Sequence, residues 1–370
     1  MTTSDPLIPA PSVVSTGSAV PSVAEPAVRV ANFVRKVGKG RTLLKSMDRV
    51  EAADAFSLLL TGAFADSQAG AFLQALRIKE LSVDELDGLM DTFLARQPAA
   101  VPKLPSGGFT LNLASDTPRK GGYGSLLAAA LLAADGLPVG VVRSEPVLSH
   151  NRASWDATWA LLAVLHKAGC CDAPHAPAAL CVVESNDLVP DLRNLRKTRG
   201  ELGFRSCLHT AEKLLNPWAD KPIVLGISHR HYAERMADHF ARRGRTAKII
   251  LGNHGTPDLV LHKETEVWEV LPGGTIRTVY FHPAQLGLAP DAAVYSLGAF
   301  AEWPAELAKP DHGALGPVLA YHLAFLRYVA GGETHAASDP LLSAMQLTPQ
   351  LAPQPAFHSE TGVNGGSANG

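Results

Sequence analysis

A glycine-containing loop between a predicted strand and a predicted helix holds the residues best suited to bind phosphate. Amides at the start of a helix point outward and its dipole favours an anion, so α/β proteins seat phosphate groups in loops of this kind. Taken alone, the loop is equally compatible with an ordinary surface turn, whose glycines only supply unusual backbone angles. Its spacing fits neither the Walker pattern nor the dinucleotide-binding fingerprint. The phosphate-binding candidates are Arg119, Lys120, Gly121, Gly122 and Ser125.

A second group of candidates is basic and follows residue 187. The segment 187–203 is predicted to be helical, and a positive row along it would bind an anionic substrate or the backbone of nucleic acid. Each basic cluster alone is more typical of a solvated helix face, and the net charge of −2 excludes a general positive bias toward nucleic acid. The row comprises Arg193, Arg196, Lys197 and Arg199, with Arg205 just beyond it. Two further clusters comprise Arg35, Lys36, Lys39, Arg41 and Lys45, and then Arg242, Arg243, Arg245 and Lys248.

Histidines and cysteines are weaker candidates for chemistry. The four cysteines have no zinc-ligand spacing, so we interpret them as buried thiols of a reducing cytoplasm. A single histidine is more often a packed or surface residue than a ligand, and we assign none of them to a site. The histidines considered are His150, His209, His229, His231 and His254.

Predicted strands and helices alternate after residue 106, which favours an α/β fold with a mostly parallel sheet covered on both faces. Strands are predicted at 109–113, 139–142, 180–183, 223–226 and 247–251, with a hairpin at 267–271 and 275–281. Helices are predicted at 125–134, at 155–168, after residue 226 and at 315–329. Upstream, three short helices form a small helical domain, two of them begun by the capping boxes Asp48–Glu51 and Ser82–Glu85.

The composition and the ends of the chain set the domain boundaries. A hydrophobic fraction of 46% and a charged fraction of 18% are typical of a globular protein, and no apolar run is long enough to span a membrane. No secretory signal is recognisable, so we expect a cytoplasmic protein. We predict disordered tails at 1–28 and 347–370, a helical domain at 29–102 joined by a hinge helix at about 187–217, and an α/β domain at 106–186 and 218–346.

Three stretches resemble one family in the same order along the chain. Residues 72–79 read Phe-Leu-Gln-Ala-Leu-Arg-Ile-Lys, and residues 199–205 read Arg-Gly-Glu-Leu-Gly-Phe-Arg before Leu215-Asn216-Pro217. Together with the late hairpin and Gln285-Leu286-Gly287-Leu288, they resemble the anthranilate phosphoribosyltransferase superfamily (glycosyltransferase family 3) over about residues 30–345. The resemblance implies a small helical domain beside a large α/β domain, and a homodimer formed through the helical domain.

The catalytic signatures of that family are degenerate in this chain. The family binds phosphoribosyl pyrophosphate (PRPP) with Gly-Thr-Gly-Gly-Asp, where residues 114–118 read Ala-Ser-Asp-Thr-Pro and Pro118 removes an amide donor. The expected Lys-His-Gly-Asn is replaced by Arg143-Ser144-Glu145-Pro146. The acidic pair that holds magnesium becomes Asp258-Leu259, which leaves Asp258 as a weak metal candidate. We therefore assign no catalytic residue and expect no cofactor, with magnesium and PRPP required only if the protein is active.

Other residues resemble a non-catalytic branch of the superfamily. Arg199 matches the family arginine near the aromatic acid substrate, whereas His209, Lys213 and the Arg119-Lys120 pair are similar to the YbiB-like branch, regarded as nucleic-acid binders. The first hypothesis is thus a non-catalytic homodimer that binds single-stranded nucleic acid, without membrane contact. The alternatives are an active phosphoribosyl (pentosyl) transferase with an altered acceptor, or a sensor of a PRPP-like phosphorylated small molecule.

Overall fold

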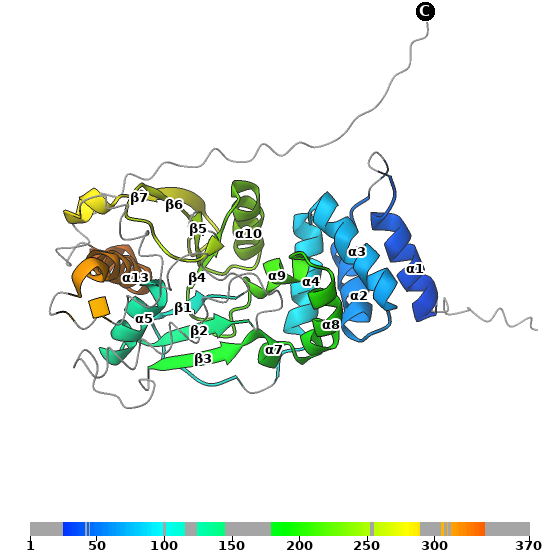
Figure 1. Ribbon diagram of the computed structural model, residues 1–370, viewed down its shortest axis with the longest axis horizontal. Helices are drawn as coiled ribbons and strands as arrows, with labels where there is room; N and C mark the ends of the chain where they lie inside the picture. Colours follow the sequence, from blue (N-terminus) through cyan, green and yellow to red (C-terminus); the bar gives the residue numbers. More distant parts are fainter. Residues whose placement is uncertain are drawn as a thin grey trace, which may run out of the picture.

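The N-terminal part of the chain is a bundle of four helices at one end of the molecule (Figure 1). The computed structural model describes residues 25–40, 43, 45–98, 101–114, 124–144, 179–251, 255–288, 305–306, 309 and 312–336. The bundle helices are α1 (Pro26–Val37), α2 (Arg49–Leu60), α3 (Asp66–Lys79) and α4 (Val83–Leu94).

The sequence predicted three of these helices and missed α1. Pro26 fits its first turn, where an amide has no helical partner, and Val30, Phe33 and Val37 bury one face. Both predicted capping boxes are confirmed. The Asp48 carboxylate accepts the Glu51 amide at 2.9 Å, and the Ser82 hydroxyl accepts the Glu85 amide at 3.2 Å.

The C-terminal part is built on a seven-stranded sheet in the order β3-β2-β1-β4-β5-β6-β7. The first five strands of that order are parallel, and β6 and β7 add an antiparallel hairpin, which confirms the predicted mostly parallel sheet. The strands are β1 (Phe109–Asn112), β2 (Val139–Arg143), β3 (Leu180–Glu184), β4 (Ile223–Ile227), β5 (Ala247–Leu251), β6 (Thr265–Val270) and β7 (Ile276–Phe281).

The two faces of the sheet have different covers. Helices α5 (Gly124–Ala134) and α13 (Gly316–Ala336) pack on the face that carries Leu111, Val141 and Val224. The other face carries Ile223 and Leu225, and it shares one continuous core with α10 (Arg230–Arg242) and the helical bundle. Figure 1 shows α10 between the sheet and α4. Alternate residues of each strand thus enter different cores, as a period of two requires.

The hinge is not the single helix that the sequence predicted. It consists of short pieces: α7 (Ser185–Leu188), the 3₁₀ helix η1 (Pro190–Leu195), α8 (Arg196–Glu201) and α9 (Cys207–Glu212). Val189 has φ −134° and ψ 80° because the proline that follows it disfavours helical backbone. Gly203, with φ +66°, lies between α8 and α9.

The remaining described elements are short. Two 3₁₀ turns, η3 (Pro283–Leu286) and η4 (Gly313–Leu315), precede α13. The helix predicted at 155–168 lies outside the described residues. Among the helices that the structure does describe, none is long and apolar enough to cross a membrane.

Candidate anion-binding site at the hinge

The carboxyl ends of β1 and β4 lie side by side at the point where the order of strands along the sheet changes direction. From β1 the chain passes to β2 and β3 on one side, whereas β4 and β5 extend the sheet on the other. Asn112 at the end of β1 is in register with Leu225 of β4. In open α/β sheets ligands bind outside the strand ends at such a switch point, so a ligand site is expected at this edge.

The hinge is fastened directly to this edge by buried polar side chains. The Asn112 amide donates to the carbonyls of Glu212 and Leu215, at 3.0 and 2.9 Å. Lys213 Nζ donates to the carbonyls of Gly226 and Gly255, at 2.9 and 2.7 Å. These contacts hold the segment that follows α9 across the ends of β1 and β4.

A buried ion pair occupies the centre of the hinge. Arg199 Nη2 lies 2.5 Å from Glu212 Oε2, and both side chains are fully enclosed. The Ser185 hydroxyl donates to the other carboxylate oxygen of Glu212 at 2.9 Å. Burial alone would raise the pKa of Glu212, but the Arg199 charge and these hydrogen bonds lower it below its usual value. Glu212 is therefore ionised and neutralises Arg199, the arginine to which the sequence resemblance draws attention.

Three other predicted residues gather around this pair. Burial, and then the charge of Arg205, lower the pKa of Lys213 to about 7. Burial, and then the charge of Arg199, lower the pKa of His209 to about 4, so its imidazole is neutral at pH 7 and accepts the Ser206 amide at 3.1 Å. The structure thus brings Arg199, Arg205, His209 and Lys213 together.

Sequence reasoning missed Arg77, a further basic residue that contacts Arg205. Arg77 of α3 donates to the carbonyl of Arg205, and its guanidinium lies 5.0 Å from the centre of the Phe204 ring. Burial, and then the charge of Arg77, lower the pKa of Arg205. We call Arg77, Phe204, Arg205 and Lys213 the hinge cluster. The signal that could have revealed Arg77 was its place in residues 72–79, one of the stretches that carry the family resemblance.

Three predicted basic residues lie apart from this cluster. Arg193 pairs with Asp187 at 2.5 Å on an exposed turn, and Lys197 lies 3.2 Å from Asp66 of the helical bundle. Arg196 is exposed on α8. The expected single row from residue 193 to 205 is therefore wrong, because Pro190 and Gly203 divide the segment and Arg199 turns inward.

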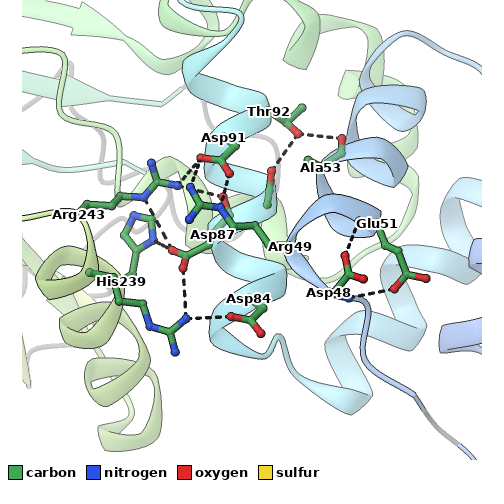
Figure 2. Close-up of polar contacts among 12 residues, drawn as sticks. Asp48, Arg49, Glu51, Ala53, Asp84, Asp87, Asp91, Thr92, His239 and Arg243 are labelled. Atoms are coloured by element: carbon green, nitrogen blue, oxygen red, sulfur yellow. Dashed lines mark hydrogen bonds and ion pairs between the residues drawn. The ribbon is translucent and has the colours of Figure 1, made fainter.

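Most of the basic side chains at 242–248 form ion pairs with carboxylates of neighbouring elements. Figure 2 shows Arg243 and His239 of the α10 region pointing toward Asp87 and Asp91 of α4. Arg243 Nη2 lies 2.6 Å from Asp91, and Lys248 lies 2.6 Å from the buried Glu269 on the neighbouring strand. In the N-terminal cluster Lys36 pairs with Glu51, and Arg41 lies outside the described residues.

The start of α5 is capped from within the chain. Asp258 Oδ1 accepts the amide of Ser125 at 2.8 Å, and both residues are buried. His322 Nε2 accepts the Leu259 amide at 2.9 Å, and its Nδ1 lies 2.8 Å from the Val318 carbonyl, so the neutral imidazole carries its proton on Nδ1. The other candidates of this loop, Arg119, Lys120, Gly121 and Gly122, lie outside the described residues.

Asp258 does not form the magnesium site of two adjacent carboxylates. Its neighbour Leu259 is buried and offers no ligand, and one Asp258 oxygen already accepts the Ser125 amide. Within the described ranges, no group of three or more histidine, cysteine, aspartate or glutamate side chains could hold a metal ion. The donor set found there does not fit magnesium, which takes several oxygen ligands.

Comparison with known families gives two matches along the chain. Residues 31–96 match the helical bundle domain of a glycosyl transferase family, and residues 124–296 match the α/β domain of a glycosyl transferase family. The anthranilate phosphoribosyltransferase of Methylobacterium nodulans is 29% identical over 270 residues, which cover 70% of this chain and 74% of that protein. The enzyme of Afipia carboxidovorans is 28% identical over 256 residues, covering 66% and 72%.

Solved structures with a similar fold belong to the same group of enzymes. Anthranilate phosphoribosyltransferase from Saccharomyces cerevisiae, in complex with PRPP and Mg, has a TM-score of 0.65 at 15% identity over 86% of this chain and 91% of that one. The enzyme from Thermus thermophilus has a TM-score of 0.61 at 19% identity, covering 85% and 92%. At these identities the likeness concerns the fold alone.

Proposed function

The chain belongs to the glycosyl transferase family that joins a helical bundle domain to an α/β domain. Within this family, we propose that it is a binding protein that does not transfer phosphoribosyl groups. The observation that carries the proposal is the buried Arg199–Glu212 pair. An arginine whose charge is already neutralised by an enclosed carboxylate has little left to offer the carboxylate of an aromatic acid. The internal cap on α5 points the same way, because Asp258 occupies an amide that a pyrophosphate would otherwise use.

The proposed ligand is single-stranded nucleic acid, bound through its phosphates at the hinge cluster. Arg77 is exposed, and Arg205 also reaches the surface although neighbouring atoms bury part of its guanidinium; single exposed ionic contacts contribute little. A polyanion engages several such cations at once and releases counterions from each phosphate, whereas a small anion cannot. A surface of neighbouring guanidiniums therefore favours a strand over a metabolite.

The binding test is fluorescence anisotropy with a labelled single strand over a salt series. The variants Arg77→Ala and Arg205→Ala should each weaken binding and reduce the slope of log K against log salt by about 0.7. Arg193→Ala is the matched control, because Arg193 is an exposed arginine already paired with Asp187 and outside the cluster. Equal losses in all three variants, or no binding at low salt, would count against the hinge cluster.

The catalytic part of the proposal has its own assay. We expect no release of pyrophosphate from PRPP in the presence of anthranilate and magnesium, because the described donors do not form the family's metal pair. Turnover above background that disappears in Asp258→Ala would overturn this expectation.

A second candidate is a transferase or sensor that binds PRPP with a different acceptor. It is favoured by two buried oxygens, Ser125 Oγ and Asp258 Oδ2, which have no hydrogen-bond partner among the residues that the structure describes. Buried polar atoms normally have one, so these oxygens are suited to a ligand or water. A rise in melting temperature with PRPP and magnesium, but not with the oligonucleotide, would select this candidate.

A further inference from the structure

Three aromatic side chains cluster where β4 leads into α10. The rings of His229 and His231 are stacked, with centroids 5.7 Å apart and planes 17° apart. The ring of Tyr232 lies 4.5 Å from that of His231 and 6.4 Å from that of His229. Both histidines are exposed, and Tyr232 is half-buried. We call these three residues the aromatic cluster.

The aromatic cluster is not needed to pack α10 on the sheet. Helix α10 packs on the sheet through Ala233, Met236, Ala237 and Phe240, which follow the aromatic cluster in sequence. Exposed aromatic rings contribute little to stability, because they keep much of their surface in water. The cluster is also no metal site, since no group of three suitable ligands occurs among the residues that the structure describes.

An arginine and a glutamate lie beside the aromatic cluster. The Arg235 guanidinium lies 5.7 Å from the centre of the Tyr232 ring, and Glu80 holds both Arg235, at 2.8 Å, and His231, at 3.1 Å. Burial and the Glu80 charge raise the pKa of Tyr232, while Arg235 and Arg77 oppose the rise. Glu80 follows the last residue of α3, the helix that carries Arg77, so its contacts with His231 and Arg235 place the aromatic cluster beside the end of that helix.

Aromatic faces beside cations form the combination that binds single strands. Bases stack on the rings whatever their sequence, while cations follow the phosphates. His229 follows β4 by two residues, so the rings stand at the same carboxyl edge where Lys213 contacts the Gly226 carbonyl. The stacked pair presents a flat surface at the carboxyl edge of the sheet, where open α/β sheets bind ligands.

We propose that His229, His231 and Tyr232 form a stacking platform for bases of a single strand whose phosphates contact Arg77 and Arg205. This inference rests on the proposed nucleic-acid binding and adds to it a contribution from the bases themselves. It implies that affinity depends on the presence of bases and only weakly on their identity, because every base has a π face.

The experiment compares two labelled strands of equal length, an oligothymidine and an abasic strand with the same number of phosphates. The wild-type protein should bind the oligothymidine at least about fivefold more tightly, since stacking on one aromatic side chain contributes that much or more. His229→Ala should reduce this preference while leaving the affinity for the abasic strand unchanged. His229→Phe should restore it, because phenylalanine keeps the flat ring and loses only the nitrogens.

The outcomes separate this inference from the function on which it rests. Equal affinity of the wild type for both strands, or an equal loss for both in His229→Ala, would overturn the stacking platform and leave phosphate binding intact. Failure of His229→Phe to restore the preference would also overturn it, because a polar role of the imidazole would then be required. Absence of binding to either strand would overturn the nucleic-acid proposal as well. Circular dichroism of each variant checks that the fold is preserved.

Discussion

His239 Nδ1 lies 2.6 Å from Asp87 Oδ1, and this buried contact joins the α/β part of the molecule to the helical bundle. Arg242 extends the contact to Asp84 at 2.8 Å, and Arg243 extends it to Asp91 at 2.6 Å. The acidic side chains recur on one face of α4, and the basic ones on the end of α10 that faces it (Figure 2). This network fixes α10 against α4, and it explains why Arg242 and Arg243 of the basic cluster at 242–248 are matched by carboxylates.

The network should make stability depend on pH. Burial lowers the pKa of His239, and the pKa of Asp87 is lowered because His239, Arg243 and Arg242 outweigh its burial. A histidine with a lowered pKa contributes stability that is present above its unfolded value of about 6.5 and is lost as the pH falls through its folded value. The lowered pKa of Asp87 also makes the protein less stable as the pH falls, but only below about pH 4.

Urea unfolding at about pH 7.5 and pH 5.5 tests the role of His239. The wild type should lose free energy of unfolding between these values, because the unfolded state binds a proton that the folded state refuses. His239→Asn keeps a donor for Asp87 but does not titrate, so its loss over the same range should be smaller. The other charged groups at the interface, including Asp84 and Asp91, remain in both proteins. Equal losses would show that His239 does not titrate as we infer.

Removing one member of the Arg199–Glu212 pair should be strongly destabilising. Glu212→Ala leaves an enclosed guanidinium without a partner, which typically costs about 3–5 kcal/mol. The double variant Arg199→Met/Glu212→Leu removes both charges and should recover most of that loss. Denaturant unfolding measures both proteins. A single variant that loses less than about 1 kcal/mol would show that water reaches the arginine.

Asp258 should stabilise the start of α5 rather than hold a metal. Asp258→Ala leaves the buried Ser125 amide without an acceptor, and we expect a loss of about 1–3 kcal/mol in the free energy of unfolding. Adding magnesium should not raise the melting temperature of the wild type. A magnesium-dependent rise that is absent in Asp258→Ala would contradict this interpretation.

The helical bundle should mediate a homodimer. Apolar side chains on its surface remain in water, with Val50 79% exposed on α2 and Val28 52% exposed on α1. Burying such side chains against a second copy would gain about 25 cal/mol per Å² of apolar surface. Light scattering should give a dimer mass for the wild type, and Val50→Glu should shift it toward the monomer. A monomer mass for the wild type at micromolar concentration would count against the dimer.

Local patterns in the sequence determined most of the elements, because they depend on neighbours within a few residues. The two capping boxes act over three positions, and the apolar residues of each strand alternate with a period of two. The same patterns were misleading at Thr110 and Asn112, which occupy alternate positions of β1 and yet are buried. The hinge covers them, and their polar groups bond to Asn216 and to the carbonyls of Glu212 and Leu215.

Only the tertiary structure decided which charges have partners. Asp258 reaches the Ser125 amide across 133 positions, and His239 reaches Asp87 across 152. A count of basic residues along the chain cannot reveal such pairings, because a charge that looks solvated in its own helix is neutralised by a distant element packed against it. The same packing set Arg77 beside Phe204 and Arg205, and it placed Glu80, at the end of α3, in contact with His231. The sequence determined most of the elements, whereas their packing decided where positive charge and aromatic surface remain accessible.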